Sequence, residues 1–516
     1  MHRIIRWLVA ASACACAGQA SAAWHKASTK HFIIYSDQNP DKLRAYAEKL
    51  ERFDHAVRHA SRSPDYDIGD GNRLTIFVTR NTNGVQRLAR DDSVAGFYVG
   101  HASGPLAFVP RSTNDRDLSA DVVFFHEYAH HMMFQDVDKP YPQWLVEGFA
   151  EFMSTATFEA DGTVVLGRAA NHRALGLLYL QPLPIETIVG ASYGRLNDVQ
   201  RESIYGRGWL LTHYLYFNDK RDGQLETYIS AISQGTPALD AAKKAFGDLK
   251  TLEKELDAYL KQRKLSALFI KPKVFHPVEV QVTPLTDGAA EVIPLRMQSK
   301  LGVNDKTAEP LAAKVRKVQA KHPGDMLVEL TLAEAEIDSG HPEASEAAAD
   351  RALASDPNNI EAMIYKGRSM GARAAAMKKP DAKLFGESRK WLQKANKADV
   401  EDPEPLYQYY LSFLTEGAQP TKNAIAALHY ASNLAPQDMN LRLMSATQHL
   451  RDKDLSQARK TLAPIAYNPH ADFYATVARA MLSRVDAGDA EGALKSVEED
   501  SESEPAAAST DPAKKS

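Results

Sequence analysis

Two histidines four residues apart, with a glutamate directly after the first, are the residues of this sequence best suited to chemistry. They are His126, Glu127 and His130, in the segment DVVFFHEYAHHMMFQ. Residues four apart lie on one face of a helix, so both imidazoles can reach one metal ion. Glu127 is then close enough to take a proton from a metal-bound water, whose pKa zinc lowers to about 7. The alternative is a polar patch on an amphipathic helix.

A catalytic zinc site also needs a third protein ligand and one open position. Downstream, the segment WLVEGFAEF supplies Glu147, with sixteen residues between it and His130. The intervening DVDKPYP is rich in turn residues and predicts a loop that reverses the chain. A second, antiparallel helix would bring Glu147 to the two imidazoles and complete a His, His, Glu set.

With this pairing, the sequence resembles the gluzincin branch of zinc metallopeptidases (peptidase MA-like), which includes thermolysin-like enzymes and zinc aminopeptidases. The resemblance rests on HExxH followed by WL-x-EG-x-A and extends over roughly residues 30–264. It implies zinc held by His126, His130 and Glu147, with Glu127 as general base. Glu151, one turn after Glu147, matches a carboxylate that orients a ligand imidazole; a solvent-facing side chain is the alternative.

Members of this family also use a Tyr or His that donates a hydrogen bond to the oxyanion of the tetrahedral intermediate. Tyr205, in the segment ESIYGRGW, is similar in placement to the tyrosine of the aminopeptidases. His213 on the same predicted helix is the alternative donor, and Tyr205 could instead be a packing aromatic. His131 adjoins a ligand but points about 100° away around the helix, which predicts a supporting or surface residue and not a ligand.

The sequence departs from the family pattern in two ways. The spacing between His130 and Glu147 is shorter than in the aminopeptidases. The strand segment GPLAFVP also has no glutamate, whereas those aminopeptidases hold the free amine of the substrate with a Glu on the equivalent strand. This absence weakens an exopeptidase interpretation. An endopeptidase needs little more from this strand than main-chain hydrogen bonds to an extended peptide.

The elements that must position these residues form an α+β pattern, with strands first and helices later. Strands are predicted at KHFIIYSD, NRLTIFVTR, AGFYVG and GPLAFVP. Apolar periodicity predicts helices over residues 40–61, 119–135, 142–158, 202–217, 223–233, 238–246 and 249–264. We therefore expect an α+β zincin-like metallopeptidase domain over residues 24–265. A linker, or a small extended segment, is predicted over residues 266–304.

Residues 305–498 are rich in Ala and Leu and predict an all-α repeat array. Prolines recur at 323, 357, 403, 436 and 469, at intervals of 34, 46, 33 and 33 residues. The pattern, clearest in SEAAADRALASDPNNIEAMIYKGRSM, resembles a tetratricopeptide (TPR)-like solenoid, whose period is about 34 residues. The long interval predicts an insertion near ARAAAMKKPDAK. A generic Ala-rich bundle is the alternative, and residues 499–516 are predicted to be disordered.

The first 23 residues have the pattern of a cleavable secretory signal, and their apolar run, from Ile4 to about Ala17, is too short to span a bilayer. Export to the periplasm is therefore expected. Both cysteines, Cys14 and Cys16, fall in this segment, so the mature chain would have none. A lipid anchor on one of them is the alternative, although Ala and Ser precede them where Leu is expected. No other stretch is apolar enough to cross a membrane.

Charge excludes nucleic acid as a partner. The formal net charge is −4, and it becomes −6 once Arg3 and Arg6 are removed with the signal. A mildly acidic chain has no electrostatic footprint for nucleic acid or an anionic membrane.

These patterns together predict an exported zinc endopeptidase with Zn²⁺ as cofactor and a protein or peptide as substrate. The TPR-like array would recruit a partner or the substrate, or cover the cleft. Two alternatives remain: an inactive peptidase-fold scaffold that binds proteins, and a zinc hydrolase of non-peptide substrates. The presence of all four residues, His126, Glu127, His130 and Glu147, favours an enzyme, because residues that no longer serve catalysis are free to be substituted.

Overall fold

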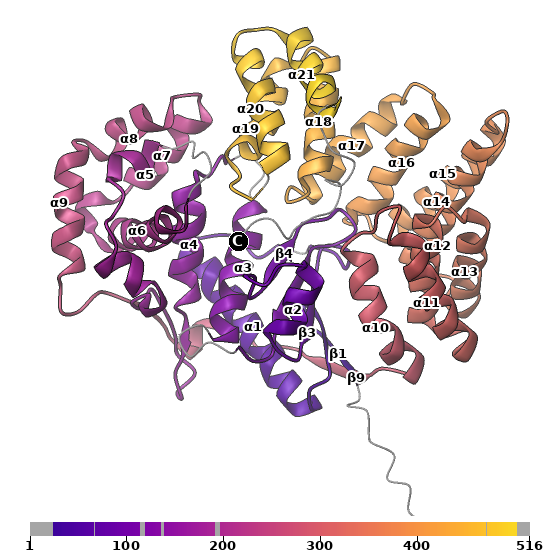
Figure 1. Cartoon of the computed structure of the whole chain (residues 1–516), viewed down its shortest axis with the longest axis horizontal. Helices are drawn as coiled ribbons and strands as arrows, with labels where there is room; N and C mark the ends of the chain where they lie inside the picture. The colour runs from indigo at the N-terminus through magenta and orange to yellow at the C-terminus, as the bar shows by residue number, and fades with distance from the viewer. Residues whose placement is uncertain are drawn as a thin grey trace, which may run out of the picture.

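The computed structural model describes residues 24–66, 68–113, 119–135, 139–190, 197–470 and 472–502. An N-terminal region built around a small sheet is followed by a long run of helices (Figure 1). This is the predicted order of an α+β region and a helical array. The predicted signal, with both cysteines, lies outside the described residues, as do residues 503–516 of the predicted tail. Within the described ranges, no helix is both long and apolar enough to cross a bilayer.

A six-stranded sheet forms the centre of the N-terminal region, in the order β4-β5-β3-β2-β1-β9. Its strands are β1 (His25–Ser28), β2 (Phe32–Ser36), β3 (Leu74–Thr79), β4 (Phe97–Val99), β5 (Leu106–Pro110) and β9 (Gln281–Pro284). Strands β2, β3 and β5 are parallel, and β4 runs antiparallel to β5. The segment GPLAFVP forms β5, which has a strand on each side, so the prediction that it pairs with a peptide is wrong. The edge strand next to it is β4.

Side chains that alternate along the strands build a core on each face of the sheet. In β3, Ile76 faces one core and Phe77 the other. The Ile76 face packs against α1 (Pro40–Ser61) and α3 (Ala120–Phe134). The Phe77 face packs against α2 (Thr82–Ala89) and α10 (Asp287–Lys300). Helix α3, which carries the histidines, is therefore fixed to the sheet as a buried element.

The helices that follow α3 form a second lobe beside the sheet (Figure 1). They are α4 (Gln143–Ser154), α5 (Ile185–Gly190), α6 (Asp198–Phe217), α7 (Gln224–Ser233), α8 (Ala238–Phe246) and α9 (Leu249–Leu260). A three-stranded sheet of β6 (Thr157–Phe158), β7 (Val164–Leu166) and β8 (Leu268–Ile270) joins this lobe. Helix α4 packs on both α3 and α6. This packing brings Glu147, in the EG motif of Glu147 and Gly148, to the histidines of α3.

Residues 266–304, predicted as a linker, are built into both sheets. Strand β8 pairs with β7, strand β9 pairs with β1, and α10 covers one face of the central sheet. These residues join the sheets because their apolar side chains pack against residues far away in the sequence, which the local pattern does not reveal. Ile293 and Met297 of α10 pack against sheet residues such as Tyr35.

The helical array continues from α10 as antiparallel pairs. Its helices are α11 (Ala308–Lys321), α12 (Met326–Asp338), α13 (Pro342–Ser355), α14 (Ile360–Ala376), α15 (Ala382–Ala398), α16 (Pro403–Glu416), α17 (Lys422–Leu434), α18 (Met439–Arg451), α19 (Leu455–Tyr467), α20 (Asp472–Asp486) and α21 (Ala490–Glu502). Figure 1 shows the array curving over the sheet region, from α10 near β9 to α19 and α20 above α3.

The recurring prolines stand at the turns of the array. Four of them lie between consecutive helices, and Pro403 is the first residue of α16, a position where the missing N–H costs nothing. The long interval is accommodated by α14 and α15, of 17 residues each, against 13 and 14 in α12 and α13. Part of the predicted insertion therefore lengthens two helices.

Candidate metal centre

His126, His130 and Glu147 meet between α3 and α4, and we call these three residues the metal centre. The Nε2 atoms of His126 and His130 are 3.0 Å apart. Oε2 of Glu147 lies 3.5 Å from the first and 3.7 Å from the second. Ligands of a tetrahedral zinc at 2.0–2.1 Å would be about 3.4 Å apart. The three donor atoms therefore surround one point at nearly the spacing that zinc requires.

An unsatisfied atom supports the same conclusion. Glu147 is only 1% exposed, and within the described chain its Oε2 receives no hydrogen bond. A buried carboxylate oxygen without a donor is costly, and such atoms are rare in folded proteins. A divalent cation between the two imidazoles would satisfy it. The three residues therefore fit a metal ion such as zinc.

Glu151 lies behind His126, on the side away from the metal centre. Its Oε1 is 3.2 Å from Nδ1 of His126, and the side chain is 1% exposed, so it does not face solvent. His172 contacts the other oxygen at 2.6 Å, and Arg173 pairs with Oε1 at 2.7 Å. Burial alone would raise the pKa of Glu151, but Arg173 and the hydrogen bonds from His126 and His172 hold it well below its usual value. A carboxylate in this position fixes the orientation of a ligand imidazole.

Glu127 lies in the same turn of α3 as His126 but outside the cluster of atoms that could bind a metal ion. Burial raises the pKa of its carboxyl group, while the charges of His126 and His470 oppose the rise. The backbone of Tyr98, on the edge strand β4, hydrogen-bonds to it. Glu127 is therefore placed between the edge of the sheet and the metal centre.

The structure distinguishes the two predicted oxyanion donors by their positions. The ring of Tyr205 stacks on His126 with centroids 6.0 Å apart. Burial raises the pKa of Tyr205, and the charge of Glu147 raises it further. His213 instead contacts the carbonyl oxygen of Gly167 and the hydroxyl of Tyr259, each at 2.9 Å. Both of its ring nitrogens are engaged away from the metal centre, so only Tyr205 lies at the site.

His131 is neither a ligand nor a surface residue. It is 2% exposed, with Nδ1 at 3.0 Å from the hydroxyl of Tyr98 and Nε2 at 2.8 Å from Gln135. Burial lowers the pKa of His131 to about 3, so its ring is neutral near pH 7. The surface alternative fails because α3 is buried on almost every side. His131 instead ties α3 to the edge strand β4.

Two glycines set the distance between the helices that carry Glu147 and Tyr205. A Cβ atom on Gly148 of α4 would lie 2.3 Å from the carbonyl oxygen of Gly208 in α6. A Cβ on Gly208 would lie 2.6 Å from the carbonyl oxygen of Trp144. The backbones of α4 and α6 are therefore in direct contact at this crossing. The glycine of the EG motif lets α6 approach closely enough to place Tyr205 beside His126.

Gly148→Ala is expected to lower the free energy of unfolding by about 1–3 kcal/mol, because the added methyl group must separate two backbones. Urea unfolding of the full chain measures this. The matched control is Gly386→Ala in α15, where a Cβ meets nothing within 4 Å. That change should stabilise the chain by about 0.5–1 kcal/mol, since alanine favours helix. Equal effects of the two changes would mean that the α4–α6 crossing tolerates a side chain.

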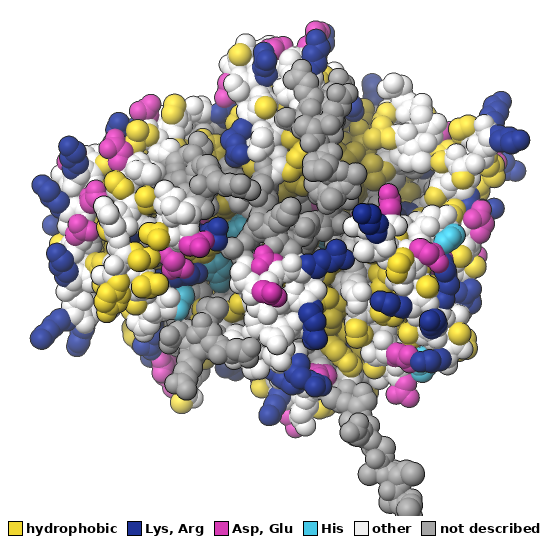
Figure 2. All heavy atoms as spheres, in the orientation of Figure 1, with side chains coloured by type: hydrophobic (Ala, Val, Ile, Leu, Met, Phe, Trp, Pro, Cys, Tyr) yellow, Lys and Arg dark blue, Asp and Glu magenta, His cyan; other side chains and the backbone are white. Residues whose placement is uncertain are grey.

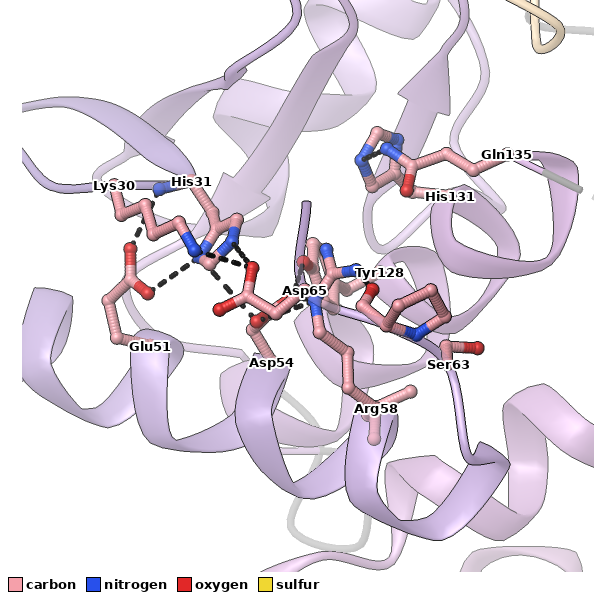
Figure 3. A network of polar contacts seen from close by, with 12 residues as sticks. Lys30, His31, Glu51, Asp54, Arg58, Ser63, Asp65, Tyr128, His131 and Gln135 are labelled. Carbon is pink, nitrogen blue, oxygen red and sulfur yellow. Dashed lines mark hydrogen bonds and ion pairs between the residues drawn. The ribbon is translucent and has the colours of Figure 1, made fainter. Parts of the chain in front are cut away.

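A polar network holds the opposite side of α3 against α1 (Figure 3). We call it the α1 network; its members are His31, Glu51, Asp54, Arg58, Asp65 and Tyr128. The hydroxyl of Tyr128 donates to Asp54 at 2.5 Å, and Nε of Arg58 donates to the same carboxylate at 2.9 Å. His31 contacts Glu51 at 2.8 Å and Asp65 at 2.9 Å. His31, Glu51 and Asp54 lie close enough to hold a metal. Because protein partners already satisfy them, we interpret the group as an ion-pair network.

Sequence reasoning missed three residues at the site. His172 and Arg173 support Glu151 from a short 3-10 helix, Asn171–Arg173. His470, from the helical array, has Nε2 at 3.1 Å from Oε1 of Glu147. None of the three belongs to a motif with a fixed spacing from the ligands. Figure 2 shows histidine side chains gathered between the α4–α9 lobe and the sheet region.

Comparison with known proteins adds no assignment: the sequence matches no known protein family and no curated protein.

Proposed function

We propose that this protein is an exported zinc endopeptidase of the gluzincin type, with a TPR-like array that engages its substrate or a partner. The observation that carries the proposal is the convergence of three donor atoms, from His126, His130 and Glu147, with Glu151 behind His126. A catalytic zinc requires three protein ligands of this kind, a carboxylate that supports a ligand imidazole, and one position left open for water or substrate. The N-terminal segment supports export to the periplasm.

The residues around the metal centre suit peptide hydrolysis. Bound zinc would polarise the substrate carbonyl and lower the pKa of a water molecule. Glu127 accepts a proton from the attacking water and later delivers it to the leaving amine. The hydroxyl of Tyr205 donates to the oxyanion as charge develops there. An extended peptide can add to an edge strand such as β4 through main-chain hydrogen bonds.

A large cavity supports a protein or peptide as the substrate. Its volume is about 1360 Å³, and Tyr98 of β4 lies in its wall. The opposite wall comes from alternate helices of the array: α12, α14, α16, α18 and α20 contribute, among others, Leu330, Tyr365, Tyr407, Asn440 and Tyr474. Stacked helix pairs present alternate helices on one concave surface, where such arrays bind peptides. The cavity thus joins the array to the edge strand.

Metal content tests the proposal. The mature chain, purified without chelators and analysed by elemental mass spectrometry, should hold about one zinc per chain. His130→Ala and Glu147→Ala should hold much less, since each removes one of three ligands. A wild type that stays free of metal after reloading would leave a protein-binding scaffold as the better interpretation. Zinc binding without cleavage of any peptide, together with turnover of an ester or another non-peptide, would favour a different hydrolase.

A further inference from the structure

We propose that His470, which belongs to the helical array, is a positioning residue of the metal centre. Its imidazole holds the carboxylate of Glu147 in place, so docking of the array and binding of the metal depend on each other. The inference rests on the zinc centre proposed above. It assigns the array a role in the metal site itself, in addition to contact with a substrate or partner.

The two oxygens of Glu147 face different residues. Oε2 points toward the imidazoles of the metal centre, while Oε1 lies 3.1 Å from Nε2 of His470. The ring of His470 also packs against that of His130, with centroids 4.6 Å apart at 63°. Ligating carboxylates usually accept a hydrogen bond on the oxygen turned away from the metal. Nε2 of His470 lies within ion-pair distance of that oxygen, as Oε1 of Glu151 lies close to Nδ1 of His126.

Successive turns of the array bring His470 to this position. In the turn before α16, Asp399 accepts a hydrogen bond from the backbone N–H of Asp70 at 3.1 Å. In the turn before α18, Asp438 accepts one from the backbone N–H of Ala102 at 2.9 Å. The turn before α20 is the next in the series, and it carries His470. Because every second turn of the array faces the N-terminal region, the regular spacing of the helix pairs determines that the turn before α20 lies at the metal centre.

Local contacts fix the direction of this last turn. The side chain of Asn468 accepts a hydrogen bond from the backbone N–H of His470 at 2.8 Å. Arg459 of α19 donates to the carbonyl oxygen of Ser233, at the end of α7, at 2.7 Å. Tyr467 packs against the main core of the N-terminal region. These contacts hold the turn through α19 and Asn468, and His470 points at Glu147.

His470 also lies between the cavity and the metal centre. The cavity wall includes His470 and Phe134, whereas no member of the metal centre is among its described lining residues. A peptide approaching from the cavity would meet His470 first. A shift of the turn between α19 and α20 would open this route and at the same time release the second oxygen of Glu147. The position of the array would then control both access and metal affinity.

The first test is zinc affinity, measured by competition with a chromophoric chelator. His470→Ala should weaken binding by about 10- to 100-fold, the usual effect of removing a group that supports a ligand. His470→Gln should retain most of the affinity, because its amide N–H can still donate to Glu147. His449→Ala, which removes a histidine of α18 stacked on His429, is the matched control and should bind zinc like the wild type.

The second test is amide hydrogen exchange with and without zinc. In the wild type, zinc should slow exchange in α19 and α20, since coupling between two sites is reciprocal. In His470→Ala this protection should be lost, a result that simple loss of packing would not give. Equal zinc affinity in wild type and His470→Ala, or equal losses in the Ala and Gln variants, would overturn the inference. A wild type that binds no zinc would instead refute the proposed function.

Discussion

Glu127→Gln is expected to lower kcat/KM for a cleaved peptide by about 10²- to 10⁴-fold, the contribution typical of a positioned general base. Glutamine keeps the shape of the side chain but cannot take a proton from water. Zinc content should stay at the wild-type level, because Glu127 is not one of the three residues whose donor atoms converge. A peptide assay on zinc-loaded protein, with elemental analysis of the same samples, measures both quantities.

Glu159→Gln is the matched control, since Glu159 lies in the same region and forms an exposed pair with Arg168. It should leave activity unchanged. Glu127→Gln with more than about one tenth of wild-type activity would contradict the assigned role. A variant that lost zinc together with activity would show that Glu127 holds the metal centre together.

Much of the fold could be predicted where the sequence pattern is local. Helix α8 begins and ends at the predicted residues, and α3 lies within the predicted range and begins after the cap at Ser119. The short strands β1, β6 and β7 were not predicted, and β8 and β9 lie in a segment for which a linker or a small extended segment was predicted. Strands of two to four residues have little pattern of their own and are stabilised by pairing with distant partners. Strand β9 is such a case, because its partner β1 lies at the other end of the N-terminal region.

The site shows the same division between local and distant information. Helical spacing could place His126 and His130 on one face and Glu151 one turn after Glu147, since helix geometry is regular. The partners of these residues could not be predicted, because they depend on how elements dock. His470 comes near Glu147 only through the curvature of the whole array. The choice between a supporting and a surface position for His131 stayed open for a related reason: a helix that is apolar on most sides has no readable surface face.

Asp54→Ala is expected to lower the free energy of unfolding by about 3–5 kcal/mol, the usual cost of removing one partner from a buried ion pair. Asp54 is 1% exposed and accepts hydrogen bonds from Arg58 and from the hydroxyl of Tyr128. Without it, a guanidinium group and a phenol remain in the core with no acceptor at that point. Urea unfolding, monitored by circular dichroism, measures the loss.

Two comparisons separate the buried network from a general effect of removing charge. Glu159→Ala breaks an exposed pair and should cost at most about 1 kcal/mol. The double change Asp54→Ala and Arg58→Met should recover part of the stability, because it leaves no uncompensated charge. If Asp54→Ala cost no more than Glu159→Ala, the α1 network would not be what holds α3.

Asp54→Ala should also weaken the binding of zinc at the metal centre. Tyr128 lies between His126 and His130 in the sequence, and its bond to Asp54 fixes α3 from the side opposite the ligands. Loosening that contact lets the helix rotate, and a rotation that moves a ligand by a fraction of an ångström spoils tetrahedral geometry. Zinc affinity of Asp54→Ala, measured well below its unfolding transition, should therefore fall, although the substituted residue touches none of the three ligands. Unchanged affinity in a destabilised chain would mean that the sheet and α4 are enough to orient α3.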